Sequence, residues 1–138
     1  MDDLTTEQRH TNMSHIRSRE NKPEIIVRKY LFSKGLRYRK NDKRYPGKPD
    51  ILLPKYHTAI FINGCFWHHH PGCKYAVIPK TNQDYWIPKL RKNIERDKAN
   101  YQDLRNAGWK VLIIWECQLK RSVQNEYLEK LYHKIIEK

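Results

Sequence analysis

The stretch Asp50-Ile-Leu-Leu-Pro-Lys-Tyr-His-Thr-Ala-Ile-Phe-Ile62 decides the fold of this chain. It contains two short, mainly apolar runs, 51–53 and 58–62, joined by the turn segment Pro54-Lys-Tyr56. Short apolar runs that are bounded by turn residues are typical of buried strands. We therefore predict two adjacent central strands, with the other elements arranged around them.

Upstream of this stretch, the sequence predicts a helix, a further strand and a loop. Asn21-Lys-Pro-Glu24 places a proline inside a first helical turn, and Gly35 marks the end of that helix. Residues 36–39 alternate apolar and basic side chains, which predicts a half-buried strand. Residues 41–49 form a polar segment with proline and glycine, which predicts a loop. The buried stripe of the helix consists of Ile25, Ile26, Tyr30 and Leu31.

Downstream, residues 63–79 show no regular pattern, although cysteine, histidine, phenylalanine and tryptophan crowd together there. We predict that this segment is the functional loop. Thr81-x-x-Asp84 has the form of a capping box and predicts the start of a long helix that ends at Gly108. Pro88 lies early enough to bend this helix rather than break it. The apolar stripe of the helix consists of Ile87, Leu90, Ile94, Tyr101 and Leu104.

The last part of the chain predicts one more strand and one more helix. Residues 109–115 form an apolar run, which predicts a continuous buried strand in which Trp109 and Trp115 are structural. A C-terminal amphipathic helix is indicated by Leu128, Leu131 and Ile135. The order helix, three strands, helix, strand, helix predicts a single α/β domain over residues 1–138.

The composition favours a polyanionic partner. The chain of 138 residues has 28 Lys and Arg against 15 Asp and Glu, which gives a formal net charge of +13. This charge, together with four Trp and nine Tyr residues that could stack on bases, favours a nucleic acid. The alternative is a basic protein that binds no nucleic acid. Residues 1–20, with a thin apolar face of Met13 and Ile16, predict an arm that contacts DNA or a frayed terminus.

The chain shows no sign of a membrane span or a signal peptide. It has no run of 18 apolar residues, and Met1-Asp-Asp-Leu4 lacks the basic and then apolar pattern of a secretory signal. We therefore expect a soluble protein in the cytoplasm. Three cysteines, an odd number in a reducing compartment, favour metal binding by thiolates over a disulfide framework.

Cys65, His70, Cys73 and Cys117 form a candidate zinc site. Three thiolates and one imidazole match the tetrahedral preference of Zn²⁺, and Cys65-x4-His70-x2-Cys73 would supply one lobe. Because Cys117 follows the last predicted strand, a zinc ion there would tie the functional loop to the sheet. The alternative is that the three cysteines are unrelated core residues.

Two further features suggest phosphodiester chemistry. The consecutive residues His68, His69 and His70 cannot all bind one metal from an extended loop, so we predict one ligand and one catalyst among them. For His69 a solvated position is the alternative. Pro49-Asp50 places an acid at the opening of an apolar strand, an arrangement that nucleases use to hold Mg²⁺ beside the scissile phosphate. A turn residue is the alternative for Asp50.

Four separated motifs resemble the very-short-patch-repair (Vsr) mismatch endonucleases. They are Pro46-Gly-Lys-Pro-Asp50, Phe61-Ile-Asn-Gly-Cys-Phe-Trp-His68, Asn93-Ile-Glu-Arg-Asp97 and Gly108-Trp-Lys-Val-Leu-Ile-Ile-Trp-Glu-Cys117. The resemblance, which extends from about Asn12 to Leu119, implies a restriction-endonuclease-like α/β fold with a mixed central sheet flanked by helices. It also implies hydrolysis of one DNA strand beside a T:G mismatch, the product of 5-methylcytosine deamination.

The resemblance implies roles for individual residues of the catalytic centre. Asp50 is similar to the Mg²⁺-binding carboxylate of the family, whose second protein ligand is a backbone carbonyl that falls at Ile62 here. His68 is similar to the residue that activates water or assists at the phosphate, and Glu24 would support both from its helix. Bound Mg²⁺ would neutralise charge on the phosphate and acidify a water, while His68 could move the proton.

The resemblance also implies a DNA-binding surface. Phe66, Trp67 and Trp86 are similar to the aromatic residues that wedge into the duplex beside the mismatch, where a mispaired site resists unstacking less. Lys89 and Asn93 share a helix face with Trp86 and are expected where the edge of the mismatch is read.

The sequence departs from the family pattern at two places. Ile62-Asn63 stands where the best-known members carry Thr-His, so a second active-site histidine is missing. A backbone ligand tolerates Ile62, and Asn63 is predicted among the DNA-binding residues. Pro71-Gly72 alters the spacing before Cys73, which leaves His69 as the alternative to His70 as zinc ligand.

We therefore expect a Mg²⁺-dependent endonuclease of very short patch repair with a structural zinc ion. Its expected substrate is double-stranded DNA with a mismatch. We expect a monomer in the bacterial cytoplasm, associated with the nucleoid when it acts, with mismatch-repair proteins as candidate partners and no membrane contact. The alternatives are a sequence-specific nicking or restriction endonuclease of the same fold and a non-catalytic, zinc-stabilised DNA-binding module.

Overall fold

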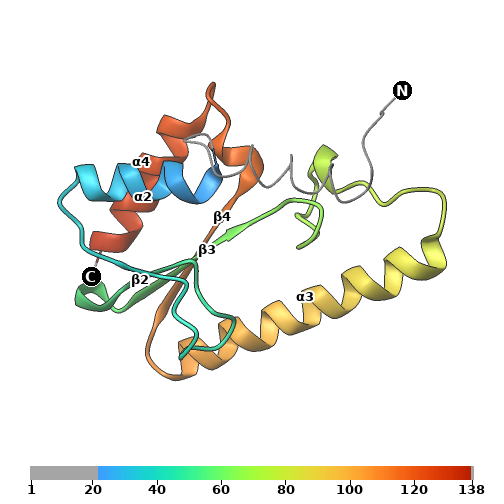
Figure 1. Cartoon of the computed structure of the whole chain (residues 1–138), viewed down its shortest axis with the longest axis horizontal. Helices are drawn as coiled ribbons and strands as arrows, with labels where there is room; N and C mark the ends of the chain where they lie inside the picture. The colour runs from blue at the N-terminus through green and yellow to red at the C-terminus, as the bar shows by residue number, and fades with distance from the viewer. Residues whose placement is uncertain (1–21, 138) are drawn as a thin grey trace, which may run out of the picture.

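Helices cover both faces of a four-stranded sheet in the computed structural model, which describes residues 22–137 (Figure 1). The helices and strands are, in chain order, α2 (Pro23–Ser33), β1 (Arg39–Lys40), β2 (Ile51–Leu53), β3 (Thr58–Asn63), α3 (Gln83–Asn106), β4 (Lys110–Trp115) and α4 (Gln124–Ile136). Short 3-10 turns lie between them: η1 (Pro54–Tyr56), η2 (Lys74–Ala76) and η3 (Glu116–Leu119). The predicted order of elements and the α/β class with a mixed sheet are confirmed.

The sheet leaves one edge of β3 open near its end. The strand order is β1-β2-β3-β4, in which β1, β2 and β3 are antiparallel neighbours and β4 is parallel to β3. β4 accompanies β3 over its whole length, whereas β2 pairs only as far as Ile60. Ile62 and Asn63 therefore extend beyond β2, and the functional groups described below gather at this step in the sheet.

The core forms two layers, one on each face of the sheet. Alternate residues of a strand point to opposite faces, so Ile60 and Ile62 pack toward α2 and α4, while Ala59 and Phe61 pack toward α3. Fully burying one aliphatic side chain contributes about 1.5–3 kcal/mol. Figure 1 shows α2 and α4 together on one side of the strands and the long helix α3 on the other.

Both long predicted helices are present, but one of their starts differs from the prediction. α2 begins at Pro23 as expected, and Gly35 with φ +81° follows its end. α3 continues through Pro88 and is followed by Gly108 with φ +90°, as predicted. The capping box of Thr81 and Asp84 is wrong, because the left-handed residue Asn82 precedes the first helical residue and no side chain caps the helix.

Two predicted strands are shorter or more exposed than expected. The strand predicted over 36–39 is only Arg39–Lys40, because β2 offers it just two partners, and both of its residues are exposed. The strand predicted as continuously buried is β4, an edge strand of the sheet in which Ile114 alone is fully buried. An edge strand has a neighbour on one side only, so most of its side chains stay partly accessible.

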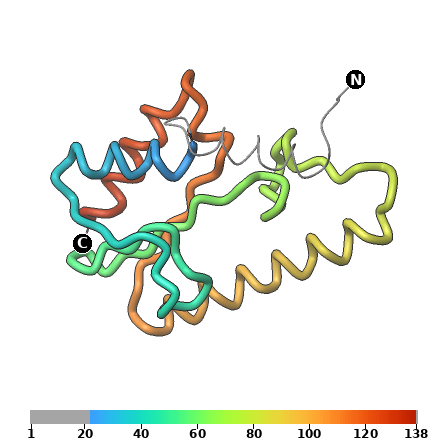
Figure 2. The backbone as a smooth tube through the Cα atoms, viewed as in Figure 1, coloured from blue at the N-terminus to red at the C-terminus, as the bar shows by residue number. Residues whose placement is uncertain are grey.

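The loop that follows β3 runs out beyond the sheet to the start of α3, and α3 then runs back toward the strands, as the backbone trace in Figure 2 shows. It contains the 3-10 turn η2 and otherwise no regular element, as predicted. In the part of the chain that the structure describes, every helix is too short or too polar to cross a membrane. The N-terminal arm predicted for residues 1–20 lies outside the described residues.

Candidate active site and metal centre

Asp50 lies where β2 begins and faces the open edge of β3. Its Oδ2 atom accepts a hydrogen bond of 2.7 Å from the backbone N–H of Ile62. This N–H has no strand partner, because β2 pairs with β3 only as far as Ile60. The Asp50 carboxylate thus accepts the hydrogen bond that a neighbouring strand would otherwise accept, and this bond fixes its position. Asp50 therefore does more than form a turn after Pro49.

The surroundings of Asp50 suit a cation. Burial raises the pKa of the Asp50 carboxyl, the nearby charge of Glu24 raises it further, and the hydrogen bond from Ile62 and the charges of His68 and Arg28 lower it. Glu24 Oε2 is buried and has no hydrogen-bond partner among the described residues. Two neighbouring carboxylates, one of them with an unpaired buried oxygen, match the oxygen ligands that Mg²⁺ prefers.

His68 reaches the same place from the loop after β3, and α3 holds it there. The Nδ1 atom of His68 lies 2.6 Å from Asp97 Oδ2, and both side chains are largely shielded from solvent. Asp97 also lies 3.6 Å from Arg96. A carboxylate that binds one ring nitrogen fixes the orientation of a histidine ring. Asp97 therefore also fixes the direction in which Nε2 of His68 points.

Asn63, the last residue of β3, is tied to the same helix. Its side chain is 3% exposed, and its Nδ2 atom donates a hydrogen bond of 2.8 Å to Tyr101 Oη. The amide therefore lies in the interior rather than on the surface. Burial raises the pKa of Tyr101 to about 12, so this phenol stays protonated at neutral pH.

These groups surround one cavity of about 230 Å³. The residues that line it come from the start of α2, the end of β3, the following loop and η3: Lys22, Pro23, Glu24, Ile62, Asn63, Gly64, Trp67, His68 and Glu116. The structure therefore brings Glu24 of α2 together with Ile62 and His68, and Asp50 lies close enough for the charges of Glu24 and His68 to act on it.

The three aromatic residues predicted as a wedge form one aromatic cluster. The ring centroids of Phe66 and Trp67 are 5.2 Å apart, those of Phe66 and Trp86 are 5.2 Å apart, and those of Trp67 and Trp86 are 5.8 Å apart. Trp67 is 47% exposed, so the cluster presents a large apolar surface to solvent. Neither buried core layer includes Trp86, which argues against a core role for it.

The helix face next to the aromatic cluster carries the two predicted polar residues. Asn93 Nδ2 donates a hydrogen bond of 3.0 Å to the backbone carbonyl of Trp67, so Asn93 holds the loop that carries Phe66 and Trp67 of the aromatic cluster. Lys89 is exposed, with its ammonium group 5.8 Å from the ring of Tyr85. Tyr85 contacts Trp86 with ring centroids 5.0 Å apart and extends the cluster by one exposed aromatic residue.

The predicted zinc ligands also come together. The ligand atoms of Cys65, His70, Cys73 and Cys117 all lie within 4.8 Å of one another, and the group could hold a metal ion. His70 Nδ1 lies 3.4 Å from Cys117 Sγ, and the His70 ring stacks on Trp115 with centroids 4.2 Å apart. Three sulfurs and one nitrogen at such separations fit the tetrahedral shell of Zn²⁺. The fold is therefore consistent with a zinc site.

The acid–base state of this cysteine cluster depends on a metal. Burial, followed by the neighbouring thiols, raises the pKa of Cys117 to about 12, and burial also raises the pKa of the Cys65 thiol. Burial lowers the pKa of His70, which favours the neutral imidazole that a metal requires. Without a metal these thiols stay protonated, so metal binding would release protons.

The structure places His69 apart from the cysteine cluster. His69 has a left-handed backbone with φ +49°, and its buried Nδ1 atom has no hydrogen-bond partner among the described residues. It lines a different cavity against α3, beside Ile87 and Leu90. The geometry thus favours His70 over His69 as the imidazole ligand.

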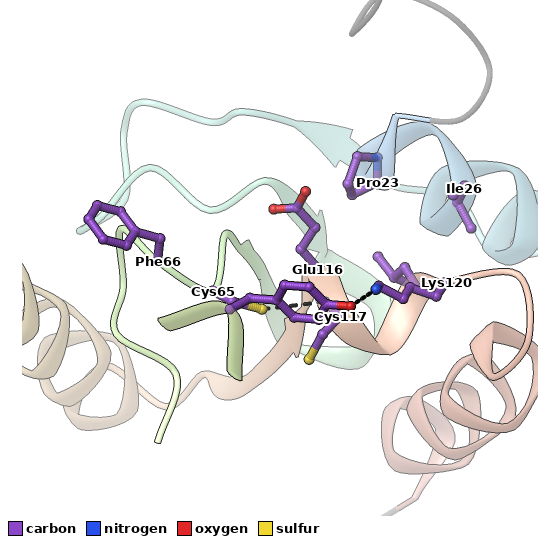
Figure 3. Close-up of a pocket in the computed structure, with 9 residues that line it drawn as sticks. Pro23, Ile26, Cys65, Phe66, Glu116, Cys117 and Lys120 are labelled. Carbon is purple, nitrogen blue, oxygen red and sulfur yellow. Dashed lines mark hydrogen bonds between the residues drawn. The ribbon is translucent and has the colours of Figure 1, made fainter. Parts of the chain in front are cut away.

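A larger cavity of about 450 Å³ opens beside Cys65 and Cys117. Figure 3 shows Pro23 and Ile26 of α2 on one side of it and Phe66 on the other, with the two sulfur atoms between them. Its walls are apolar side chains and thiols, apart from Glu116 and Lys120. Glu24 and His68 line the smaller cavity instead, and Glu116 lies between the two because it lines both.

Sequence reasoning gave no role to three residues of this region. Asp97 lies inside a quoted motif, Tyr101 was counted only as core, and Arg28 was not singled out. The signal was available for two of them: Asn93, Asp97 and Tyr101 recur every four residues and so share one face of α3. Their partners could not be named, because the loop that meets this face has no regular pattern.

Comparison with known proteins identifies the family of this chain. The chain matches the family model described as DNA mismatch endonuclease Vsr over residues 1–74. It is 51% identical to the type II nicking enzyme V.NmeAIP of Neisseria meningitidis serogroup A, over 97% of this chain and 96% of that protein. It is 42% identical to the type II nicking enzyme V.XorIIP of Xanthomonas oryzae pv. oryzae, over 86% of each chain.

A third relative is the DNA mismatch endonuclease Vsr of Escherichia coli K12, which is 40% identical over 81% of this chain and 71% of its own length. The family model covers more than half of the chain, and all three relatives align along most of their length. These matches confirm the resemblance inferred from the four motifs. The chain belongs to the DNA mismatch endonuclease Vsr family, a family of DNA endonucleases.

Proposed function

We propose that this chain nicks one strand of double-stranded DNA beside a T:G mismatch that arises from 5-methylcytosine deamination. The observation that carries the proposal is the arrangement of one short segment after β3. There His68, held by Asp97, lies near the half-buried carboxylate of Asp50, while its neighbour Trp67 is exposed to solvent. A reactive group and a probe of base stacking thus sit next to each other on one loop.

The proposed magnesium ligands are Asp50 and the backbone carbonyl of Ile62. In a strand, the N–H and C=O of one residue point to the same side. Because the Ile62 N–H is bonded to Asp50, its carbonyl faces the same open edge, where β2 no longer pairs. Glu24 supports the site with a buried oxygen that has no donor among the described residues. When bound, Mg²⁺ would neutralise charge on the phosphate and acidify a water.

His68 is the proposed proton-transfer residue. Asp97 occupies its Nδ1 atom, which leaves Nε2 as the nitrogen that can exchange a proton with water or with the departing oxygen. The neighbouring Asn63 cannot exchange protons, and its amide is already bonded to Tyr101. The chain therefore works with one histidine at this centre, rather than the two that the best-known members of the family carry.

Phe66, Trp67 and Trp86 are the proposed wedge. Inserting such a cluster unstacks a base step at a cost of a few kcal/mol, and a mispaired step costs less than a matched one. Asn93 ties the backbone of Trp67 to α3, and Asp97 ties His68 to the same helix. Lys89 lies on the same helix, where its charge can contact a phosphate or a base edge.

Cys65, His70, Cys73 and Cys117 are proposed to bind a structural zinc ion. Their ligand atoms lie within 4.8 Å of one another, and the residues come from the loop and from η3. One ion would therefore attach the loop that carries His68 and Trp67 to the end of β4. Its proposed role is to hold the loop, not to act on the phosphate.

A sequence-specific nicking endonuclease is the second candidate. It is favoured by the names of two relatives, which are called type II nicking enzymes. Such an enzyme would use the same residues at the phosphate but would select its site through base contacts in a matched duplex. The open question between the two is what the aromatic cluster recognises.

Strand-labelled duplexes that differ in a single base pair separate these candidates. The series contains one T:G pair, the matched T:A and C:G pairs and the other mismatches, each within several flanking sequences. With Mg²⁺ we expect a nick in the strand that carries the mispaired thymine and little cleavage of matched DNA. Equal cleavage of a matched duplex would favour the second candidate, and binding without any cleavage would favour a non-catalytic module.

A further inference from the structure

Asn63 and Tyr101 form a buried pair at the place where this chain departs from the family pattern. The Asn63 amide donates to Tyr101 Oη at 2.8 Å, and their side chains are 3% and 9% exposed. The Tyr101 ring also packs edge-on against Phe61, with centroids 4.8 Å apart. The Tyr101 hydroxyl therefore has a fixed position. Its oxygen accepts the hydrogen bond from Asn63, and among the described residues the Asn63 side chain has no other hydrogen-bond partner.

The pair belongs to a row of contacts between one helix face and one strand end. Asp97 and Tyr101 are four residues apart on α3 and so lie one helical turn from each other. Asp97 holds His68 at 2.6 Å, and Tyr101 holds Asn63 at 2.8 Å. α3 thus holds both ends of the segment 63–68. Asp97 bonds the proposed proton-transfer residue His68, and Tyr101 bonds Asn63 at the end of β3.

The hydrogen bond between Tyr101 and Asn63 affects a proposed metal ligand, the backbone carbonyl of Ile62. The carbonyl of Ile62 is part of the same peptide group as the N–H of Asn63, so the two cannot rotate independently. β4 fixes the Asn63 backbone from one side, through the register Asn63↔Trp115, and Tyr101 fixes its side chain from the helix side. On the other edge of β3 no strand of the described chain reaches this peptide, and only the Asp50 carboxylate contacts Ile62 N–H.

We propose that Tyr101 is a positioning residue of the nuclease centre, which acts through Asn63 to aim the Ile62 carbonyl at the metal beside Asp50. This inference rests on the magnesium ligands of the proposed function. Asn63 stands where the family pattern has a histidine. Its amide is hydrogen-bonded to Tyr101, carries no charge and transfers no proton. Tyr101 suits this task, because burial and the charges of Asp97 and Asp50 keep its phenol protonated.

The test is a titration of zinc-loaded, DNA-free protein with Mn²⁺, in which the electron paramagnetic resonance signal reports unbound Mn²⁺. The variants are Tyr101→Phe, Asn63→Ala and the double variant. Tyr101→Phe retains the ring that packs on Phe61 and removes only the hydroxyl. Gln102→Ala is the matched control, because it removes an exposed hydrogen bond of the same helix, from Gln102 to Asn106 at 2.9 Å, that faces away from the site. Asp50→Asn verifies that the titrated site is the nuclease centre.

We expect each single variant to weaken Mn²⁺ binding about 10- to 100-fold, the usual effect of removing a group that orients a metal ligand. Because the two residues act as one unit, the double variant should lose no more than either single variant. Gln102→Ala should bind as the wild type does. Melting temperatures measured alongside ensure that titrations are made on folded protein, and Asn63→Ala answers the question if Tyr101→Phe does not fold.

Wild-type Mn²⁺ affinity in Tyr101→Phe or Asn63→Ala would overturn the inference, as would losses that multiply in the double variant. Nicking of the T:G duplex is measured on the same wild-type preparation. If the wild type nicks while its Mn²⁺ affinity is independent of Tyr101, the inference alone fails. If Mn²⁺ binding depends on Tyr101 and no duplex is nicked, the inference stands and the proposed function fails.

Discussion

The cysteine cluster and the proposed nuclease centre share residues from the loop after β3, yet they are held in place by different means. At the proposed nuclease centre three polar side chains have partners in a strand or helix: Asp50 with Ile62 at 2.7 Å, His68 with Asp97 at 2.6 Å and Asn63 with Tyr101 at 2.8 Å. In the cysteine cluster the contacts are weak ones to sulfur, such as 3.4 Å between Cys117 and His70. The proposed nuclease centre is thus held by hydrogen bonds of the protein itself, whereas we expect the cysteine cluster to depend on a bound metal for its stability.

The largest effect should come from breaking the cysteine cluster. In Cys117→Ala the loop loses its attachment to η3, and with it a share of the metal-binding free energy, which in structural zinc sites is on the order of 10 kcal/mol. We expect loss of bound zinc by elemental analysis and a fall in melting temperature of about 10 °C or more. Asp50→Asn is the control and should retain zinc. A Cys117→Ala protein with wild-type melting temperature would contradict a structural role for the cluster.

Asp50→Ala should produce the opposite pattern. Removing the proposed metal ligand forfeits several kcal/mol of transition-state stabilisation, which corresponds to about a 1000-fold slower nicking rate or worse. Binding to the duplex should change little, because most contacts are to phosphates. Single-turnover nicking and a fluorescence binding assay measure the two properties separately. Nicking within tenfold of the wild-type rate would remove Asp50 from the centre.

Asp97→Asn sharpens the comparison within the nuclease centre. The amide can still reach His68, but it no longer offers a carboxylate to Nδ1, so the ring loses its fixed orientation. We expect a rate of nicking about 10- to 100-fold lower, with an unchanged KM for DNA. Arg96→Gln, which removes the longer contact of 3.6 Å to Asp97, is the matched control and should cost much less. A KM effect without a rate effect would place Asp97 in DNA binding instead.

Trp67→Ala tests the aromatic cluster, whose residues Phe66 and Trp67 lie between Cys65 of the cysteine cluster and His68 of the proposed nuclease centre. Stacking of one base on an aromatic residue contributes about 1–3 kcal/mol, so discrimination between T:G and T:A duplexes should fall by roughly one to two powers of ten. The cleavage rate on the T:G duplex should fall less than in the Asp50 variant. Tyr85→Ala, at the exposed margin of the aromatic cluster, is the comparison variant. Unchanged discrimination in Trp67→Ala would mean that the wedge lies elsewhere.

The smallest expected effect is a pH dependence of stability. Because burial raises the pKa of Asp50 in the folded protein, the folded state binds this proton more tightly than the unfolded chain does. This tighter proton binding stabilises the folded state. The stabilisation is fully present below the pKa of about 4 that Asp50 has in the unfolded chain, and it is lost as pH rises through the pKa of the folded protein. Without added Mg²⁺, Asp50→Asn should therefore melt higher than the wild type at pH 7 and not at pH 4. A wild type that melts higher than Asp50→Asn at pH 7 would contradict this sign.

The fold was predictable where side chains repeat with a period. The paired runs at 51–53 and 58–62 gave the central strands, and the spacing of Leu128, Leu131 and Ile135 gave α4. The exposure of β4 was not predictable, because an apolar run does not show whether a second neighbour will pair with it. The start of α3 was missed, because the left-handed turn at Asn82 depends on the loop before it.

The candidate site was predictable as a set of residues and not as a set of contacts. The sequence identified Asp50, His68 and the four cysteine-cluster residues. It did not show that Asn63 faces inward, because strand alternation places it toward α3 only once the end of β3 is known. Nor did it pair His68 with Asp97, which lies 29 positions away along the chain.

The most direct test of the account is single-turnover nicking by the zinc-loaded wild type on two duplexes that differ only in a T:G or T:A pair, with and without Mg²⁺. We expect a nick in the thymine strand of the T:G duplex at least about 100-fold faster than in the matched duplex, and none without a divalent ion. Equal rates on the two duplexes would contradict mismatch recognition, and cleavage that persists without Mg²⁺ would contradict the assigned nuclease centre.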